Sequence, residues 1–209
     1  FHRFHGMWAF AIYDSLRNRL IISVDRFGVK PLYYTTTRDG GIAFGSELKS
    51  LFSVSSKLDL RWDLTGVRTA ILNPLTIEGT GNTIISNLKT LRGGEYIEAT
   101  ANSLSVRTWW NTADHLDQDI PKTEADQVQK FREILTDATK LRLRSDVPIA
   151  TSLSGGLDSS SIVGLLKNIG GLQGQAAFVH AFEGTPHDES AYAKKVLDYT
   201  RTPGHWIRA

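Results

Sequence analysis

The chain has 209 residues, 41% hydrophobic and 22% charged, which is enough for one large or two small packed domains. Its net charge of +2 is too small to indicate binding to nucleic acid or to a membrane surface. The lack of cysteine excludes disulfides, thiolate zinc sites and a cysteine nucleophile within the chain. No apolar run approaches the ~20 residues of a membrane span, so we expect a cytoplasmic protein. Because the chain begins at Phe1 and stops soon after a strand–helix unit, we expect it to be a segment of a longer protein.

The first part of the chain is expected to form short antiparallel strands. Residues 6–14, GMWAFAIYD, alternate between two mainly apolar sets of side chains, which is typical of a strand covered on both faces. Further strands are predicted at 20–24, 32–37 and 42–45, separated by turns. Ser46 is placed to cap a short helix that ends at Leu51. The local pattern therefore predicts a β-meander.

The turn between the second and third strands carries three charged residues, Asp25, Arg26 and Lys30. The sequence leaves three interpretations open: a pairing of Asp25 with Arg26, an interface, or a solvated turn. An exposed pair stabilises a protein by only about 0–1 kcal/mol, so the pattern alone does not choose between them.

The middle of the chain is expected to lead into a polar linker. A helix is predicted at 63–72, and strands at 95–99 and 104–110 are predicted to form a hairpin around Ala101 and Asn102. Polar residues and prolines dominate 111–123. We place the boundary between two domains near residue 112.

The second half alternates helices with strands. Thr123 and Asp126 resemble a capping pair at the start of a long amphipathic helix. Strands at 149–153 and 176–182 flank a helix at 158–168, and another helix is predicted at 189–199. Connections of this length predict a parallel sheet, with ligands bound beyond the carboxyl ends of its strands. Ser154 and Glu183 follow those ends.

The turn at Ser154-Gly155-Gly156 is the most informative feature. Paired glycines allow unusual backbone angles and close approach of a ligand, and the next helix begins with unpaired N–H groups at the positive end of its dipole. Hydroxyls at 159–161 add donors. The turn therefore predicts an anion site, most simply for phosphate. It is not a Walker loop, since GxxxxGK[ST] is absent, and a plain capped strand–helix turn is the alternative.

Several motifs carry a family resemblance. The stretch SGGLDSS resembles the pyrophosphate loop of ATP-pyrophosphatase enzymes. The blocks GMWAFAIYD, DRFGVKPLYY, FGSELKSL and SDVPIATSLSGGLDSS, in that order, resemble the glutamine-hydrolysing asparagine synthetase family. The chain departs from the family at Arg92-Gly93-Gly94-Glu95, which replaces the usual Leu-Pro-Pro-Gly-His segment.

The resemblance implies two domain portions with different folds. Residues 1–112 would be the C-terminal portion of a type 2 glutamine amidotransferase domain, an α+β N-terminal-nucleophile fold with stacked antiparallel sheets. Residues 113–209 would be the N-terminal portion of an α/β, parallel-sheet ATP-pyrophosphatase domain.

The resemblance also implies an ATP site. Ser154, Gly155, Gly156, Ser159 and Ser160 would hold the β- and γ-phosphates. Asp158 would bind Mg²⁺, or else cap the helix. Leu153 would contact ATP through its backbone, and either Phe182 or Glu183 would contact adenine. We expect the DExxYA block, Asp188 to Ala193, to cap and open the last helix.

Two residues of the first domain are candidates for an ammonia passage. By resemblance, Met7 and Val29 lie where the family carries ammonia between its two sites, and ordinary core packing is the alternative for each. The family's catalytic cysteine and glutamine-binding residues lie upstream of GMWAFAIYD. No catalytic residue is therefore assigned, and we expect the chain alone not to hydrolyse glutamine.

The implied activity is ATP-dependent amidation of aspartate to asparagine, through an acyl-adenylate and with ammonia from glutamine. The implied substrates are glutamine and aspartate, with ATP and Mg²⁺, and homodimerisation of the intact protein is left open. One alternative is an amidotransferase of the same scaffold that acts on another carboxylate, as β-lactam synthetase does. The other is a non-catalytic glutaminase-like module.

Overall fold

The computed structural model describes residues 1–170 and 175–208, and the chain forms two units, Phe1–Leu116 and Asp117–Ala209. The first unit contains β1 (Ala9–Asp14), β2 (Arg19–Val24), β3 (Tyr33–Thr36), β4 (Ile42–Gly45), α1 (Leu48–Phe52), α2 (Leu64–Leu72), β5 (Lys89–Thr90), β6 (Glu95–Thr100) and β7 (Ser103–Thr108). The second contains α3 (Glu124–Leu141), β8 (Ala150–Ser152), α4 (Leu157–Asn168), β9 (Ala176–Ala181), α5 (Ser190–Thr200) and β10 (Gly204–Arg208). Within the described residues, no helix is both long enough and apolar enough to cross a membrane.

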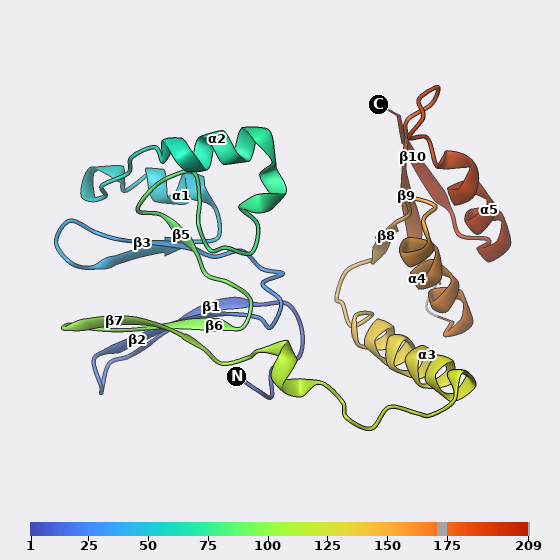
Figure 1. Ribbon diagram of the computed structural model, residues 1–209, viewed down its shortest axis with the longest axis horizontal. Coiled ribbons are helices and arrows are strands. Elements are labelled where there is room, and N and C mark those ends of the chain that lie inside the picture. The colour runs from blue at the N-terminus through green and yellow to red at the C-terminus, as the bar shows by residue number, and fades with distance from the viewer. Residues whose placement is uncertain (171–174, 209) are drawn as a thin grey trace. The chain divides into compact units, whose positions relative to one another are not determined.

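The first unit stacks two antiparallel sheets, of strand order β1-β2-β6-β7 and β4-β3-β5, as Figure 1 shows. Their strands are rich in β-branched and aromatic residues, which favour pleated surfaces. The core between the sheets consists of Ile22, Val24, Leu32, Leu91 and Ile97, all at most 4% exposed. The resemblance to a fold with stacked antiparallel sheets is consistent with this arrangement.

A second core lies on the other face of the β4-β3-β5 sheet, where α1 and α2 form the outer layer (Figure 1). Leu51 of α1 packs with Leu58, Ile85 and Leu88. Asp63 caps α2, since its carboxylate accepts a hydrogen bond from Thr65 N at 3.1 Å. This sheet is therefore covered on both faces by apolar side chains.

Three local expectations need correction. The strands do not form one meander, because the chain leaves the first sheet after β2 and pairs β3 with β4 in the second. In β1, Phe10 is half-buried but Ile12 is 56% exposed, so the strand is not covered along both faces. Ser46 does not cap α1, whose N-cap is Glu47 with no side-chain hydrogen bond. The β6–β7 hairpin around Ala101 and Asn102 is confirmed.

The Asp25 carboxylate is the central polar contact of the first unit. Asp25 is 1% exposed and directly follows β2. Its two oxygens accept four backbone hydrogen bonds at 3.0–3.2 Å, from the N–H groups of Trp8, Phe27, Val29 and Lys30. Burial by itself raises the pKa of this carboxyl, but the four N–H groups outweigh it and hold the pKa below its usual value. The Asp25 carboxylate is thus neither solvated nor paired with Arg26, although Phe27, Val29 and Lys30 of the same turn are exposed.

The turn after β2 also packs backbone against backbone on the turn before β6. A Cβ at Gly93 would lie 2.6 Å from Phe27 C and 2.7 Å from Gly28 N. Gly94 has φ +75°, and its N–H donates to Asp25 O at 2.9 Å. Only glycine permits this approach, which explains the two adjacent glycines where the sequence departs from the family that it resembles.

The second unit contains a parallel sheet of order β10-β9-β8. Helices α4 and α5 pack on one face of it, in a core formed by Leu153, Val163, Ala177, Val179, Ala193 and Leu197. The Thr123 hydroxyl accepts from Asp126 N at 3.2 Å and donates to the Asp126 carboxylate at 2.7 Å, so the predicted capping pair of α3 is confirmed. The parallel pairing brings the carboxyl ends of the three strands to one edge.

We expect Asp25→Asn to lower the free energy of unfolding of the first unit by about 3 kcal/mol at neutral pH, because an amide has one acceptor oxygen for four donors. The difference should shrink as pH falls below the unfolded pKa near 3.9 and through the lower folded pKa, where the wild-type carboxyl is protonated. Urea unfolding followed by tryptophan fluorescence at pH 7 and pH 3 measures it. Glu78→Gln, in an exposed turn, is the control, and a difference independent of pH would contradict the account.

Candidate functional site

The candidate site of the second unit is the turn between β8 and α4. Leu153, 1% exposed, anchors the end of the strand in the core and donates its N–H to Phe178 O at 2.9 Å. Gly155 adopts φ +94°, in the region that favours glycine. Gly156 is the N-cap of α4 and, as a glycine, supplies no side-chain cap to the helix. The predicted sequence of strand, glycine turn and helix is confirmed.

The serine hydroxyls hold this turn in shape. Ser159 Oγ accepts from Ser154 N at 3.2 Å and lies 3.0 Å from Ser154 Oγ. Ser154 Oγ in turn accepts from Gly156 N at 3.2 Å. Ser160 Oγ is buried and has no hydrogen-bond partner among the described residues, so any ligand contact by this hydroxyl requires its side chain to rotate.

The first turn of α4 leaves its donors available. In the part of the chain that the structure describes, no group accepts a hydrogen bond from the N–H of Leu157, Asp158 or Ser159. Asp158 is exposed in this first turn and does not act as the cap. These donors, at the positive end of the helix dipole, suit an anion.

The two residues predicted near adenine have different environments at the end of β9. Glu183 forms an ion pair with Arg208 at 3.4 Å. Phe182 is 41% exposed, and its ring lies 4.3 Å from that of His180. A cavity of about 700 Å³ between α5 and β10 has Glu183 on its wall but none of the residues 154–160. Phe182 thus presents apolar surface at this edge, whereas the Glu183 carboxylate is paired with Arg208.

In the first unit, Asp25 brings the two predicted passage residues together. The N–H of Trp8, which follows Met7, and the N–H of Val29 bind the same carboxylate. Met7 is 57% exposed and Val29 is 51% exposed, so neither side chain is part of the packed core. The sequence did not indicate this arrangement, because backbone N–H groups carry no sequence signature.

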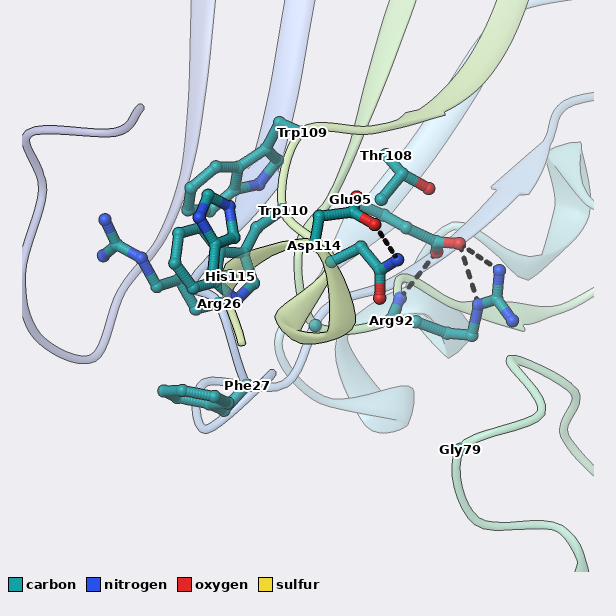
Figure 2. A pocket seen from close by; sticks show the side chains of 12 residues that line it. Arg26, Phe27, Gly79, Arg92, Glu95, Thr108, Trp109, Trp110, Asp114 and His115 are labelled. Carbon is teal, nitrogen blue, oxygen red and sulfur yellow. Dashed lines mark hydrogen bonds and ion pairs between the residues drawn. The ribbon is translucent and has the colours of Figure 1, made fainter. Parts of the chain in front are cut away.

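A polar cavity of about 730 Å³ lies at the end of β7, as Figure 2 shows. Its wall includes Trp110, whose ring stacks on His115 at 3.8 Å and faces the Arg26 guanidinium at 4.6 Å on the same wall. Across the cavity, Arg92 forms an ion pair with the buried Glu95 carboxylate at 2.5 Å (Figure 2). No sequence pattern indicates this cavity, because its wall combines residues far apart in the chain.

Comparisons with known proteins match both units. The family model described as glutamine amidotransferase domain matches residues 1–110, more than half of the chain, and the one described as asparagine synthase matches residues 130–208. The chain belongs to the glutamine-hydrolysing asparagine synthetase family. The order of the two matches along the chain agrees with the order of the sequence motifs and of the two units.

Individual curated relatives match nearly the whole of this chain. It is 33% identical over 206 residues to a protein of Methanocaldococcus jannaschii provisionally named asparagine synthetase [glutamine-hydrolyzing] 2, covering 97% of this chain and 38% of that protein. It is 31% identical to asparagine synthetase [glutamine-hydrolyzing] 3 of Bacillus subtilis, covering 97% and 32%. It is 28% identical to Amidase chry2 of Gibberella zeae, covering 97% and 31%. The chain thus spans about a third of the length of the curated relatives it matches.

We expect Ser159→Ala to loosen the glycine turn of this family member. The change removes the acceptor for Ser154 N, a loss of about 1 kcal/mol that should speed exchange of the Ser154 amide hydrogen about fivefold. Ser161→Ala, an exposed position in the same helix, is the control and should leave that rate unchanged. Hydrogen exchange followed by NMR measures both, and an equal effect of the two variants would refute the role of Ser159.

Proposed function

We propose that the intact protein carrying this chain is a ligase that forms asparagine from aspartate, using ATP and ammonia released from glutamine. The single observation that carries the proposal is the turn at Ser154–Ser159, with its shape held by hydroxyls and its helix donors unpaired. The family match supports glutamine as the ammonia source and aspartate as the acceptor. The alternative of another carboxylate has no stronger support.

The proposed site assigns each residue a task. The N–H groups at the start of α4 and the hydroxyls of Ser154 and Ser159 bind the β- and γ-phosphates. The backbone of Leu153 contacts the nucleotide, and Phe182 packs against adenine. Asp158 would hold Mg²⁺, which prefers carboxylate and phosphate oxygens and neutralises phosphate charge. Among residues 1–170 and 175–208 no group of three or more acidic, histidine or cysteine side chains forms a metal site, so phosphate oxygens would supply further ligands.

The proposed reaction has two steps. A carboxylate oxygen of aspartate attacks the α-phosphorus of ATP, and pyrophosphate leaves. The donors of the turn stabilise the charge that grows on this leaving group, and their fixed positions avoid reorganisation during the reaction. Ammonia then attacks the acyl carbon and AMP leaves, giving asparagine. Met7 and Val29 would line the path of ammonia, where apolar side chains keep it unprotonated.

The reaction predicts aspartate-dependent exchange between ATP and labelled pyrophosphate in the intact protein. Exchange reports adenylation, because pyrophosphate must leave and return while the acyl-adenylate is bound. Aspartate should support exchange well above the level seen with glutamate, the control acid that is one methylene longer. Exchange with a different carboxylate, and none with aspartate, would overturn the choice of acceptor.

The role of Asp158 is tested by thermal unfolding of the 209-residue chain. ATP with Mg²⁺ should raise the melting temperature by a few degrees, since a ligand that binds the folded state stabilises it. Asp158→Asn should lose most of the part that depends on Mg²⁺. Asp146→Asn, an exposed carboxyl outside the turn, should keep it. Equal shifts in Asp158→Asn and wild type would remove the metal role.

A further inference from the structure

Gly155 lies directly against the first turn of α5. A Cβ at Gly155 would lie 2.8 Å from Ala193 N, 2.9 Å from Glu189 O and 3.0 Å from Tyr192 Cβ. Two of these are main-chain atoms, and Tyr192 Cβ is fixed to the main chain, so none can rotate away. The glycine of the candidate site is therefore in contact with a segment more than 30 residues further along the chain.

The first turn of α5 is itself well fixed. The Asp188 carboxylate accepts from Ser190 N at 3.1 Å and from Ser190 Oγ at 3.0 Å. The Glu189 carbonyl accepts from the N–H groups of Tyr192 and Ala193 at 2.9 and 3.2 Å. Because the Asp188 carboxylate and the Glu189 carbonyl both accept hydrogen bonds, this turn is rigid enough to set the position of Gly155, which packs against it.

The same turn reaches the core under the site. Ala193 is 0% exposed and belongs to the cluster that contains Leu153, the residue just before the glycine turn. The residue that leads into the site and the helix behind it thus share one packed core. A volume change at Ala193 must be absorbed by this core or by the turn at Gly155, since protein interiors have few voids.

We infer that the first turn of α5, Glu189 to Ala193, is a positioning element for the anion-binding turn: it holds Gly155 so that the N–H groups of Leu157, Asp158 and Ser159 converge on one ligand oxygen cluster. These residues act through Gly155 and touch no ligand themselves. From the sequence we expected the DExxYA block only to cap and begin the helix. In this inference it also positions the anion-binding turn. The consequence for affinity rests on the proposed ATP site, whereas the contact itself does not.

The test compares Ala193→Val with Ala191→Val in the full chain. Both changes place a β-branched residue in the first turn of the same helix and cost the same helix propensity. Ala191 is exposed, so its variant leaves the contact with Gly155 intact. Ala193→Ser, which adds a single oxygen, is a milder variant in case Ala193→Val does not fold.

Two measurements are made well below the melting temperature. Amide NMR of the ligand-free protein reports the positions of Gly155, Leu157 and Asp158. Isothermal titration with ATP and Mg²⁺ reports affinity. We expect the Ala193 variants to shift the three loop amides and to weaken ATP binding by about tenfold, because small displacements of positioned donors are costly, while Ala191→Val changes neither.

The outcomes separate the inference from the proposed function. Loop amides unchanged in both Ala193 variants would overturn the positioning role, whether or not ATP binds. Shifted amides with unchanged ATP affinity would also overturn it, since the position would not matter to the ligand. Shifted amides in a chain whose wild type binds no ATP would support the contact and remove the ATP site.

Discussion

The first unit depends on a buried carboxylate whose hydrogen-bond partners, among the described residues, are all backbone N–H groups. Removing Asp25 from water is costly unless its oxygens are fully hydrogen-bonded. The donors come from the residue before β1 and from the turn after β2, and they converge only when both segments are in place. The carboxylate therefore couples the start of the first strand to the end of the second. Half of the donors would leave the buried charge poorly paired, so we expect this corner to fold as one unit.

The same corner explains an unusual stretch of sequence. The turn after β2, fixed by Asp25, presses its main chain onto Gly93, and Asp25 O also accepts from Gly94 N. Any side chain at Gly93 would enter the space of Phe27 and Gly28. The pair of glycines thus replaces the prolines usual in this family without loss of a turn. The chain continues from Gly94 directly into β6. The contact between the turn after β2 and the turn before β6 therefore helps to place β6 in the β1-β2-β6-β7 sheet.

Short-range sequence patterns predicted most helices, strands and turns, but they did not predict contacts between residues far apart in the chain. The capping pair of α3, the β6–β7 hairpin and the glycine turn before α4 depend on residues close in sequence, and each was predicted from its pattern. The division of strands β1 to β4 between two sheets was not predicted, because the alternation of apolar side chains indicates a strand but does not identify the strand it pairs with. The donors around Asp25 and the contact of Gly155 with α5 were missed for the same reason: backbone groups carry no sequence signature.

Each unit contains a turn that can bind an anion, and the two turns differ in whether the chain itself supplies that anion. In both, a turn directs several backbone N–H groups toward one region. In the first unit, the chain supplies the anion itself through Asp25, and every donor is satisfied. In the second, Asp158 lies in the first turn of α4 but caps nothing, and the donors of Leu157 to Ser159 find no acceptor among the described residues. Asp158 would repel a bare phosphate, so the proposed site needs a cation between the two to balance the charge. The arrangement suits a metal-bound polyphosphate better than a free one, because Asp158 could then bind the cation while the N–H groups bind the phosphate oxygens.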